Sequence, residues 1–161
     1  MIKGCKYGTH RVIEPQGVLP QPALKINNDM NIYSNEILID VMALNVDSAS
    51  FTQIEEEAGH DVEKIKAKIK EIVGERGKMQ NPVTGSGGML IGTIEKIGDD
   101  LVGKTDLKVG DKIATLVSLS LTPLRIDEIV DVKPDIDRVE IKGKAILFES
   151  GWVLPRRCGE C

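Results

Sequence analysis

The sequence contains few aromatic residues and few cysteines. Phe, Trp and Tyr make up 3% of its 161 residues, which argues against a stacking platform for nucleic-acid bases or an aromatic groove for sugars. Its three cysteines are an odd number, and two of them, Cys158 and Cys161, lie in the last four residues. A disulfide framework is therefore not expected.

An excess of positive charge and a long apolar run are also missing. Lys and Arg total 21 against 25 Asp and Glu, a net charge of −4, whereas nucleic-acid binding requires clustered positive charge. No segment approaches the ~18 uninterrupted apolar residues of a membrane span. Residues 1–10 lack the apolar segment of a signal peptide. We therefore expect a cytoplasmic protein with neither a nucleic-acid nor a membrane partner.

Short apolar runs separated by glycine, proline and aspartate predict a mostly β fold with minor α structure. The runs cover residues 36–44, 89–97, 111–117, 125–132, 139–141 and 145–148, with a further candidate strand at residues 11–15. Gly92, inside the second run, predicts a β-bulge or a close backbone approach. Strands of this kind in one domain are typical of a barrel or a sandwich.

One clear helix is predicted, with a second, shorter helix as an option. Residues 62–73 carry apolar side chains at helical spacing, at Val62, Ile65, Ile69, Ile72 and Val73. Asp61 is the expected N-cap of this helix, and Gly74 is its expected left-handed C-terminal residue. The spacing of Ser50 and Gln53 matches a capping box and predicts a shorter helix that ends at Gly59.

Residues 84–88, Thr-Gly-Ser-Gly-Gly, form a glycine cluster of the kind that can hold a phosphate group. Phosphate loops and dinucleotide fingerprints open a helix, whereas an apolar strand follows this cluster. A close-packed backbone turn is therefore the favoured interpretation.

The remaining chemically active residues do not identify a particular reaction. Glu55–Glu57 with His60 could bind a cation or an amine, or could simply form a solvated helix end. His10 has no partner at metal-ligand spacing and is expected at the surface or at a strand edge. Cys158 and Cys161 have the spacing of a redox pair or half a zinc site, but no second cysteine pair completes a four-ligand site.

Three segments, taken together, resemble the N-terminal GroES-like domain of the medium-chain dehydrogenase superfamily. They are residues 37–50, 81–98 and 107–113, in that order. The resemblance implies a partly open β-barrel with one or two helices. It also implies a substrate-side domain at residues 1–151, followed by a short tail at residues 152–161.

Residues 7–15, 50–60 and 117–124 are similar to one branch of that superfamily, the L-erythro-3,5-diaminohexanoate dehydrogenases of lysine fermentation. The similarity implies oxidative deamination of a small amino-acid-like substrate. Hydride passes from the amine-bearing carbon to NAD, and the resulting imine hydrolyses to a ketone and ammonia. The alternatives are a non-catalytic GroES-like module that binds a small molecule or a protein, and a redox or metal protein that uses the two tail cysteines. A homo-oligomer is compatible with each of them.

The sequence departs from the superfamily at its zinc positions. Asp47 occupies the position of the catalytic zinc cysteine, and Gly88 and Met89 occupy those of a histidine and a glutamate. The cysteine-rich structural-zinc lobe is missing as well. We therefore expect no metal in this chain.

The resemblance places the substrate cleft along residues 45–57. Carboxylates there would pair with the ammonium groups of the substrate, and a general base would deprotonate the reacting amine. The candidates are Asp47 and His60 for catalysis, and Asp47, Ser48, Ser50, Thr52, Glu55 and Glu56 for substrate binding. Asp47 has a second interpretation, as the residue that caps the following helix.

No strand-turn-helix glycine fingerprint occurs in the sequence, so a Rossmann domain is not predicted. We therefore expect this chain to bind no NAD and to be inactive without a cofactor domain. Residues 156–161 differ in composition from the rest. Back-translated with suitable codons and read one base later, they give Glu-Asp-Val-Glu-Asn, which suggests a frameshifted tail on a truncated chain.

Overall fold

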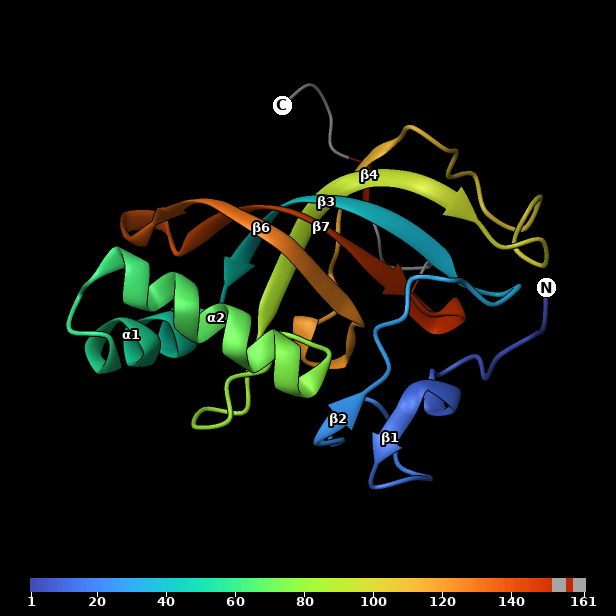
Figure 1. Cartoon of the computed structure of the whole chain (residues 1–161). Coiled ribbons are helices and arrows are strands. Elements are labelled where there is room, and N and C mark those ends of the chain that lie inside the picture. The colour runs from blue at the N-terminus through green and yellow to red at the C-terminus, as the bar shows by residue number, and fades with distance from the viewer. Residues whose placement is uncertain (152–155, 158–161) are drawn as a thin grey trace.

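The computed structural model describes residues 1–151 and the backbone of residues 156–157 (Figure 1). The strands are β1 (Val12–Glu14), β2 (Lys25–Ile26), β3 (Ile37–Val46), β4 (Gly88–Ile97), β5 (Lys112–Ala114), β6 (Leu124–Lys133), β7 (Arg138–Leu147) and β8 (Arg156–Arg157). The helices are α1 (Ser48–Glu57) and α2 (Val62–Arg76), and short 3₁₀ turns are η1 (Thr9–Arg11), η2 (Leu119–Leu121), η3 (Pro134–Ile136) and η4 (Glu149–Gly151).

The strands form one large sheet and one small one. The large sheet has the order β6-β7-β3-β4-β5-β8, and β1 pairs with β2 in the small sheet. Every pairing is antiparallel. Helices α1 and α2 lie against one face of the large sheet, at the left of Figure 1, and the β1–β2 pair lies at the lower right. The prediction of a mostly β fold with minor α structure is confirmed, and the large sheet is open, as in a partly open barrel.

The central strand β3 organises the core because its side chains alternate between the helices and the opposite face. Ile37, Ile39 and Val41 are buried beneath the helices, whereas Asp40 is exposed on the outer face. Gly92 pairs with Val41, where the β3–β4 register shifts. A Cβ atom at Gly92 would lie 2.4 Å from the Asp40 carbonyl oxygen, so the predicted close approach is confirmed.

Helix α2 packs on the sheet through the predicted apolar face. Ile65 and Ile69 are fully buried and Ile72 is 3% exposed, in the same core cluster as the inner face of β3. Val62 is an exception, because it is 39% exposed at the start of the helix. The N-cap prediction for Asp61 is confirmed, since its side chain accepts hydrogen bonds from the backbone amides of Glu63 and Lys64.

The end of α2 and the start of α1 differ from the predictions. Helix α2 continues through Gly74 and ends at Arg76, with Gly77 as its C-cap at φ 73°. A Cβ atom at Gly77 would lie 2.1 Å from the Ile26 carbonyl oxygen of β2, so this glycine is required both for its backbone conformation and for the close approach. Helix α1 begins at Ser48 after an Asp47 N-cap, not at Ser50, and it ends at Glu57, before Gly59.

Three strand predictions need correction. Within residues 111–117 only Lys112–Ala114 forms a strand. Directly after it, the Thr115 amide donates to the Leu90 carbonyl oxygen, and the Leu90 amide donates to the side-chain hydroxyl of Thr115 instead of to a backbone group. The two runs at 139–141 and 145–148 form the single strand β7, in which Gly143 leaves room for the Arg125 carbonyl oxygen. Residues 11–15 form the end of η1 and the short strand β1.

The exposed part of the outer face of the large sheet carries charged side chains. Ion pairs connect its strands, from Lys142 on β7 to Glu128 on the neighbouring β6, and from Lys144 on β7 across β3 to Glu95 on β4. A strand that alternates between a buried apolar face and a charged face has its charged side in solvent. Among the described residues, no helix is long and apolar enough to cross a membrane.

Candidate functional site

A cluster of one carboxylate and three hydroxyl groups lies where β3 ends and α1 begins. Asp47 and Ser50 come from the first turn of α1, and Thr84 and Ser86 come from the loop that leads into β4. The two segments meet because Val46 pairs with Gly88 in the β3–β4 ladder. We call these four residues the Asp47 cluster.

The four side chains are linked by short contacts. The Ser86 hydroxyl donates to Oδ2 of Asp47 over 2.9 Å. The Ser50 hydroxyl lies 2.8 Å from that of Ser86 and 2.6 Å from that of Thr84. Ser50 is fully buried, whereas Thr84 is exposed, so the cluster runs from the protein interior to the surface.

Asp47 itself is half-buried and uses only one of its two carboxylate oxygens. Oδ2 accepts a hydrogen bond from the Ser86 hydroxyl and a longer one, at 3.4 Å, from the Ser50 amide in the first turn of α1. The capping interpretation is thereby confirmed. No group in the described part of the chain donates a hydrogen bond to Oδ1. A half-buried carboxylate oxygen without a partner is a suitable acceptor for an ammonium group.

The glycines of residues 84–88 allow the loop to reach this position. The Asp47 amide donates to the Gly87 carbonyl oxygen over 2.9 Å. Gly88 has φ 129°, and a Cβ atom there would lie 2.1 Å from the Asn45 carbonyl oxygen. The prediction of a close-packed turn is confirmed. Thr84 and Ser86 were not among the predicted site residues, although both hydroxyl residues lie within the glycine cluster.

The structure brings together only part of the predicted site. Ser48, Thr52 and Glu56 are exposed on α1, and Glu55 is half-buried. Their spacing of four, seven and eight residues places them along one side of the helix. That side differs from the one on which Ser50 meets the loop, so these residues form a separate polar stripe. Their part in substrate binding stays a prediction.

His60 lies beyond the far end of α1. It has φ 61°, its side chain is 69% exposed, and its Nδ1 lies 2.9 Å from Oε1 of Glu55. Helix α1 has ten residues and is therefore about 15 Å long, with Asp47 at the opposite end. The structure thus separates the two predicted catalytic residues, and a catalytic role for His60 stays a prediction.

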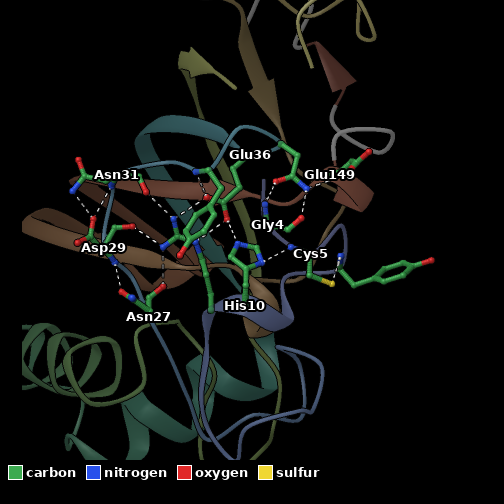
Figure 2. A network of polar contacts seen from close by, with 12 residues as sticks. Gly4, Cys5, His10, Asn27, Asp29, Asn31, Glu36 and Glu149 are labelled. Atoms are coloured by element: carbon green, nitrogen blue, oxygen red, sulfur yellow. Dashed lines mark hydrogen bonds and ion pairs between the residues drawn. The ribbon is translucent and has the colours of Figure 1, made fainter. Parts of the chain in front are cut away.

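A second polar network surrounds Arg11 and Glu36 (Figure 2). The Arg11 guanidinium donates to both Glu36 oxygens and to three backbone carbonyl oxygens, those of Asn27, Asp29 and Asn31. Glu36 also accepts the amide of Tyr33. All five N–H groups of the arginine and both oxygens of the carboxylate are therefore in use. This network holds residues 27–31 close to Glu36, the residue that precedes β3.

His10 belongs to this network and is not a surface or strand-edge residue, as the sequence had suggested. Its side chain is 15% exposed, and Nε2 lies 2.9 Å from Oε2 of Glu36. The Cys5 amide donates to Nδ1, so Nε2 carries the proton that Glu36 accepts. The earlier prediction is wrong because the partner of His10 lies 26 residues away.

Burial alone would raise the pKa of Glu36. Hydrogen bonds from Arg11, from His10 and from the Tyr33 amide outweigh that effect and lower the pKa to about 2. A carboxylate that is ionised and fully paired has no capacity left for a ligand. The Arg11–Glu36 network is therefore structural, whereas the Asp47 cluster retains a free acceptor.

A buried lysine, Lys78, lies in the segment between α2 and the loop of the Asp47 cluster. Nζ of Lys78 donates to the carbonyl oxygens of Pro20 and Gln21, over 2.6 and 3.1 Å. The neighbouring Gln80 side chain donates to the carbonyl oxygens of Gln21 and Gly85. Burial, and to a lesser degree the charge of Arg76, lowers the pKa of Lys78 to about 8.

The described residues do not fit a dinucleotide cofactor. The sheets are wholly antiparallel, whereas dinucleotides bind at the start of a helix in a parallel βαβ unit. The glycine cluster leads into β4 and not into a helix. No group of three or more His, Cys, Asp or Glu side chains at metal distance occurs in the described part of the chain. Cys158 and Cys161 lie outside it.

Comparisons with known proteins agree with one another. Residues 10–156 match the family described as L-erythro-3,5-diaminohexanoate dehydrogenase N-terminal domain. A relative named L-erythro-3,5-diaminohexanoate dehydrogenase from Fusobacterium nucleatum is 88% identical over 158 residues, which are 97% of this chain and 46% of the relative. One of the same name from Acetoanaerobium sticklandii is 89% identical over 150 residues, 93% of this chain and 44% of the relative. The chain therefore spans less than half the length of either relative.

Proposed function

Because the chain belongs to the family of L-erythro-3,5-diaminohexanoate dehydrogenase N-terminal domains, we propose that it is the substrate-side part of an enzyme that oxidatively deaminates such a diaminohexanoate. The observation that carries the proposal is the free Oδ1 of Asp47, at the point where the resemblance placed the substrate cleft. A diaminohexanoate carries two ammonium groups and one carboxylate, and its amines are suited to an ionised carboxylate.

On this proposal Asp47 has two successive roles. Oδ1 first accepts a hydrogen bond from the reacting ammonium group, while Oδ2 stays fixed by Ser86. It then takes a proton from that group, because a carbon that bears an ammonium is a poor hydride donor. In this proposal the exposed stripe of Ser48, Thr52 and Glu56, on the helix that Asp47 caps, binds the remainder of the substrate.

NAD is the hydride acceptor in this proposal, and other residues would hold it. The antiparallel sheets of this chain do not fit a dinucleotide, and more than half of each relative lies outside the matched segment. We expect the nucleotide to be bound by that uncovered part. The chain by itself is then expected to turn over no substrate.

The test uses a chimera in which residues 1–150 replace the matching segment of the Acetoanaerobium sticklandii relative. Asp47→Asn keeps the size of the side chain and a capping oxygen but removes the charge. A lost charge-assisted contact is worth about 1.5–3 kcal/mol, so kcat/KM should fall about 10- to 150-fold. A loss of less than about threefold would refute the role of Asp47.

Asp40→Asn is the matched control. Asp40 lies on the same strand β3 but is exposed on the outer face of the sheet, where Lys144 is 4.0 Å away. This variant should retain kcat/KM within about twofold of the parent chimera. A loss as large as that of Asp47→Asn would show that the enzyme responds to net charge and not to this carboxylate.

A further inference from the structure

The hydroxyl of Ser86 links the carboxylate of Asp47 to the other two hydroxyls of the cluster. An ionised carboxylate has no proton to donate, so the Ser86 hydroxyl must donate across the 2.9 Å contact to Asp47. A hydroxyl group has one proton, and Ser86 has then used it. Ser86 can then only accept from the other two hydroxyls, and those of Ser50 and Thr84 lie 2.8 and 3.1 Å from it.

The hydroxyls of Thr84 and Ser50 also contact each other, over 2.6 Å, and either can be the donor. In both arrangements Thr84 reaches Asp47 only through Ser86, either directly or by way of Ser50. The three hydroxyls thus form one connected network, from exposed Thr84 through buried Ser50 and half-buried Ser86 to Oδ2 of Asp47. Hydrogen bonds in series polarise one another, and each donor strengthens the next.

We propose that Thr84, Ser50 and Ser86 act together as positioning residues for Asp47 in the deamination. They hold the carboxylate through Oδ2, so that Oδ1 remains directed at the amine of the substrate. The inference rests on the proposed role of Asp47 and extends it to a residue, Thr84, that does not touch the carboxylate. Thr84 acts only through the hydroxyls of Ser50 and Ser86, both of which it contacts.

This arrangement restrains Asp47 more than capping alone. The Ser50 amide is a distant partner of the carboxylate, at 3.4 Å, whereas the Ser86 hydroxyl is 2.9 Å away. Ser50 is held in turn, because Asn81 donates to its carbonyl oxygen from the base of the loop. An acceptor fixed before the substrate arrives loses less freedom on binding than a mobile one.

The experiment uses the chimera described above and two conservative changes at Thr84. Thr84→Val keeps the shape of the side chain and removes its hydroxyl, whereas Thr84→Ser keeps the hydroxyl. We expect Thr84→Val to lower kcat/KM about 5- to 20-fold and Thr84→Ser to stay within twofold of the parent. Because Thr84 is exposed, both variants should melt within a few degrees of the parent.

A double-mutant cycle separates positioning from general damage. If Thr84 acts through Asp47, Thr84→Val should have less than a twofold effect on the residual activity of an Asp47→Asn chimera. Equal losses in both backgrounds would overturn the inference, as would an equal loss in Thr84→Ser or a full-rate Thr84→Val.

The two proposals fail in different ways. A full-rate Asp47→Asn chimera would refute the role of Asp47 itself, and the positioning inference would fall with it. An inactive Asp47→Asn together with a full-rate Thr84→Val would leave the proposed function intact. It would refute only the positioning role of the three hydroxyls.

Discussion

Arg11 and Glu36 form a two-point ion pair, with Nε 2.7 Å from Oε2 and Nη2 2.8 Å from Oε1, although 25 residues separate them in the chain. Both side chains are 1% exposed. Removing one partner of such a pair leaves a buried charge uncompensated, which costs more than the pair itself contributes.

Arg11→Met is therefore expected to lower the free energy of unfolding by about 3–5 kcal/mol, measured by urea denaturation at pH 7. Arg125→Met is the matched control, because the Arg125–Asp127 pair is about half exposed and should contribute less than about 1 kcal/mol. Equal effects of the two changes would contradict the structural role assigned to Arg11.

The acid sensitivity of the protein should depend on Glu36. Its pKa is about 2 in the folded protein and 4.5 in the unfolded chain, so its contribution to stability is complete above pH 4.5 and is lost as the pH falls toward 2. The difference in unfolding free energy between the parent and Glu36→Gln should shrink across this range. Parallel curves from pH 6 to pH 2 would show that Glu36 is not the group responsible.

The local pattern of the sequence was enough to predict the main elements. Buried isoleucines at helical spacing in α2 and alternation along β3 reflect contacts with a single neighbouring layer. The end of α2 could not be predicted, because Gly74 and Gly77 are both glycines. Which of them ends the helix depends on the approach of Ile26 from β2, a contact that no local pattern reveals.

Only part of the candidate site could be predicted, because its residues come from segments that are far apart in the sequence. Asp47 stands out because it occupies the position of a metal ligand in the resembled superfamily. Its partner Ser86 is 39 residues away and becomes a neighbour only through the register of β3 against β4. His10 was misjudged in the same way, since only the folded chain brings it to Glu36.

The apolar face of α2 should contribute strongly to stability. Ile69 is fully buried, and its replacement by alanine leaves a cavity that the surrounding core fills only in part. Ile69→Ala should lower the free energy of unfolding by about 2–5 kcal/mol, measured by urea denaturation. Val62→Ala, at a position 39% exposed on the same helix, is the control and should cost less than about 1 kcal/mol. A small effect at Ile69 would mean that α2 does not pack on the sheet in solution.

Lys78 should make the protein more stable as the pH rises above 8. Burial lowers its pKa from 10.5 to about 8, so between these values the unfolded chain binds more protons at this position than the folded protein does. The free energy of unfolding then increases with pH through that window, because deprotonation removes the cost of burying the charge. In Lys78→Met this contribution to the slope should disappear, as measured by urea denaturation at intervals from pH 7.5 to 10.5.

Lys70→Met provides the comparison, since Lys70 is an exposed lysine on α2 and should leave the slope of the parent unchanged. Lys78→Met also removes the hydrogen bonds to Pro20 and Gln21 and is expected to be less stable at every pH. That uniform loss does not affect the test, which depends on the slope alone. If Lys78→Met and the parent gain stability equally between pH 8 and 10.5, the ammonium group of Lys78 is not held at a lowered pKa in the folded protein.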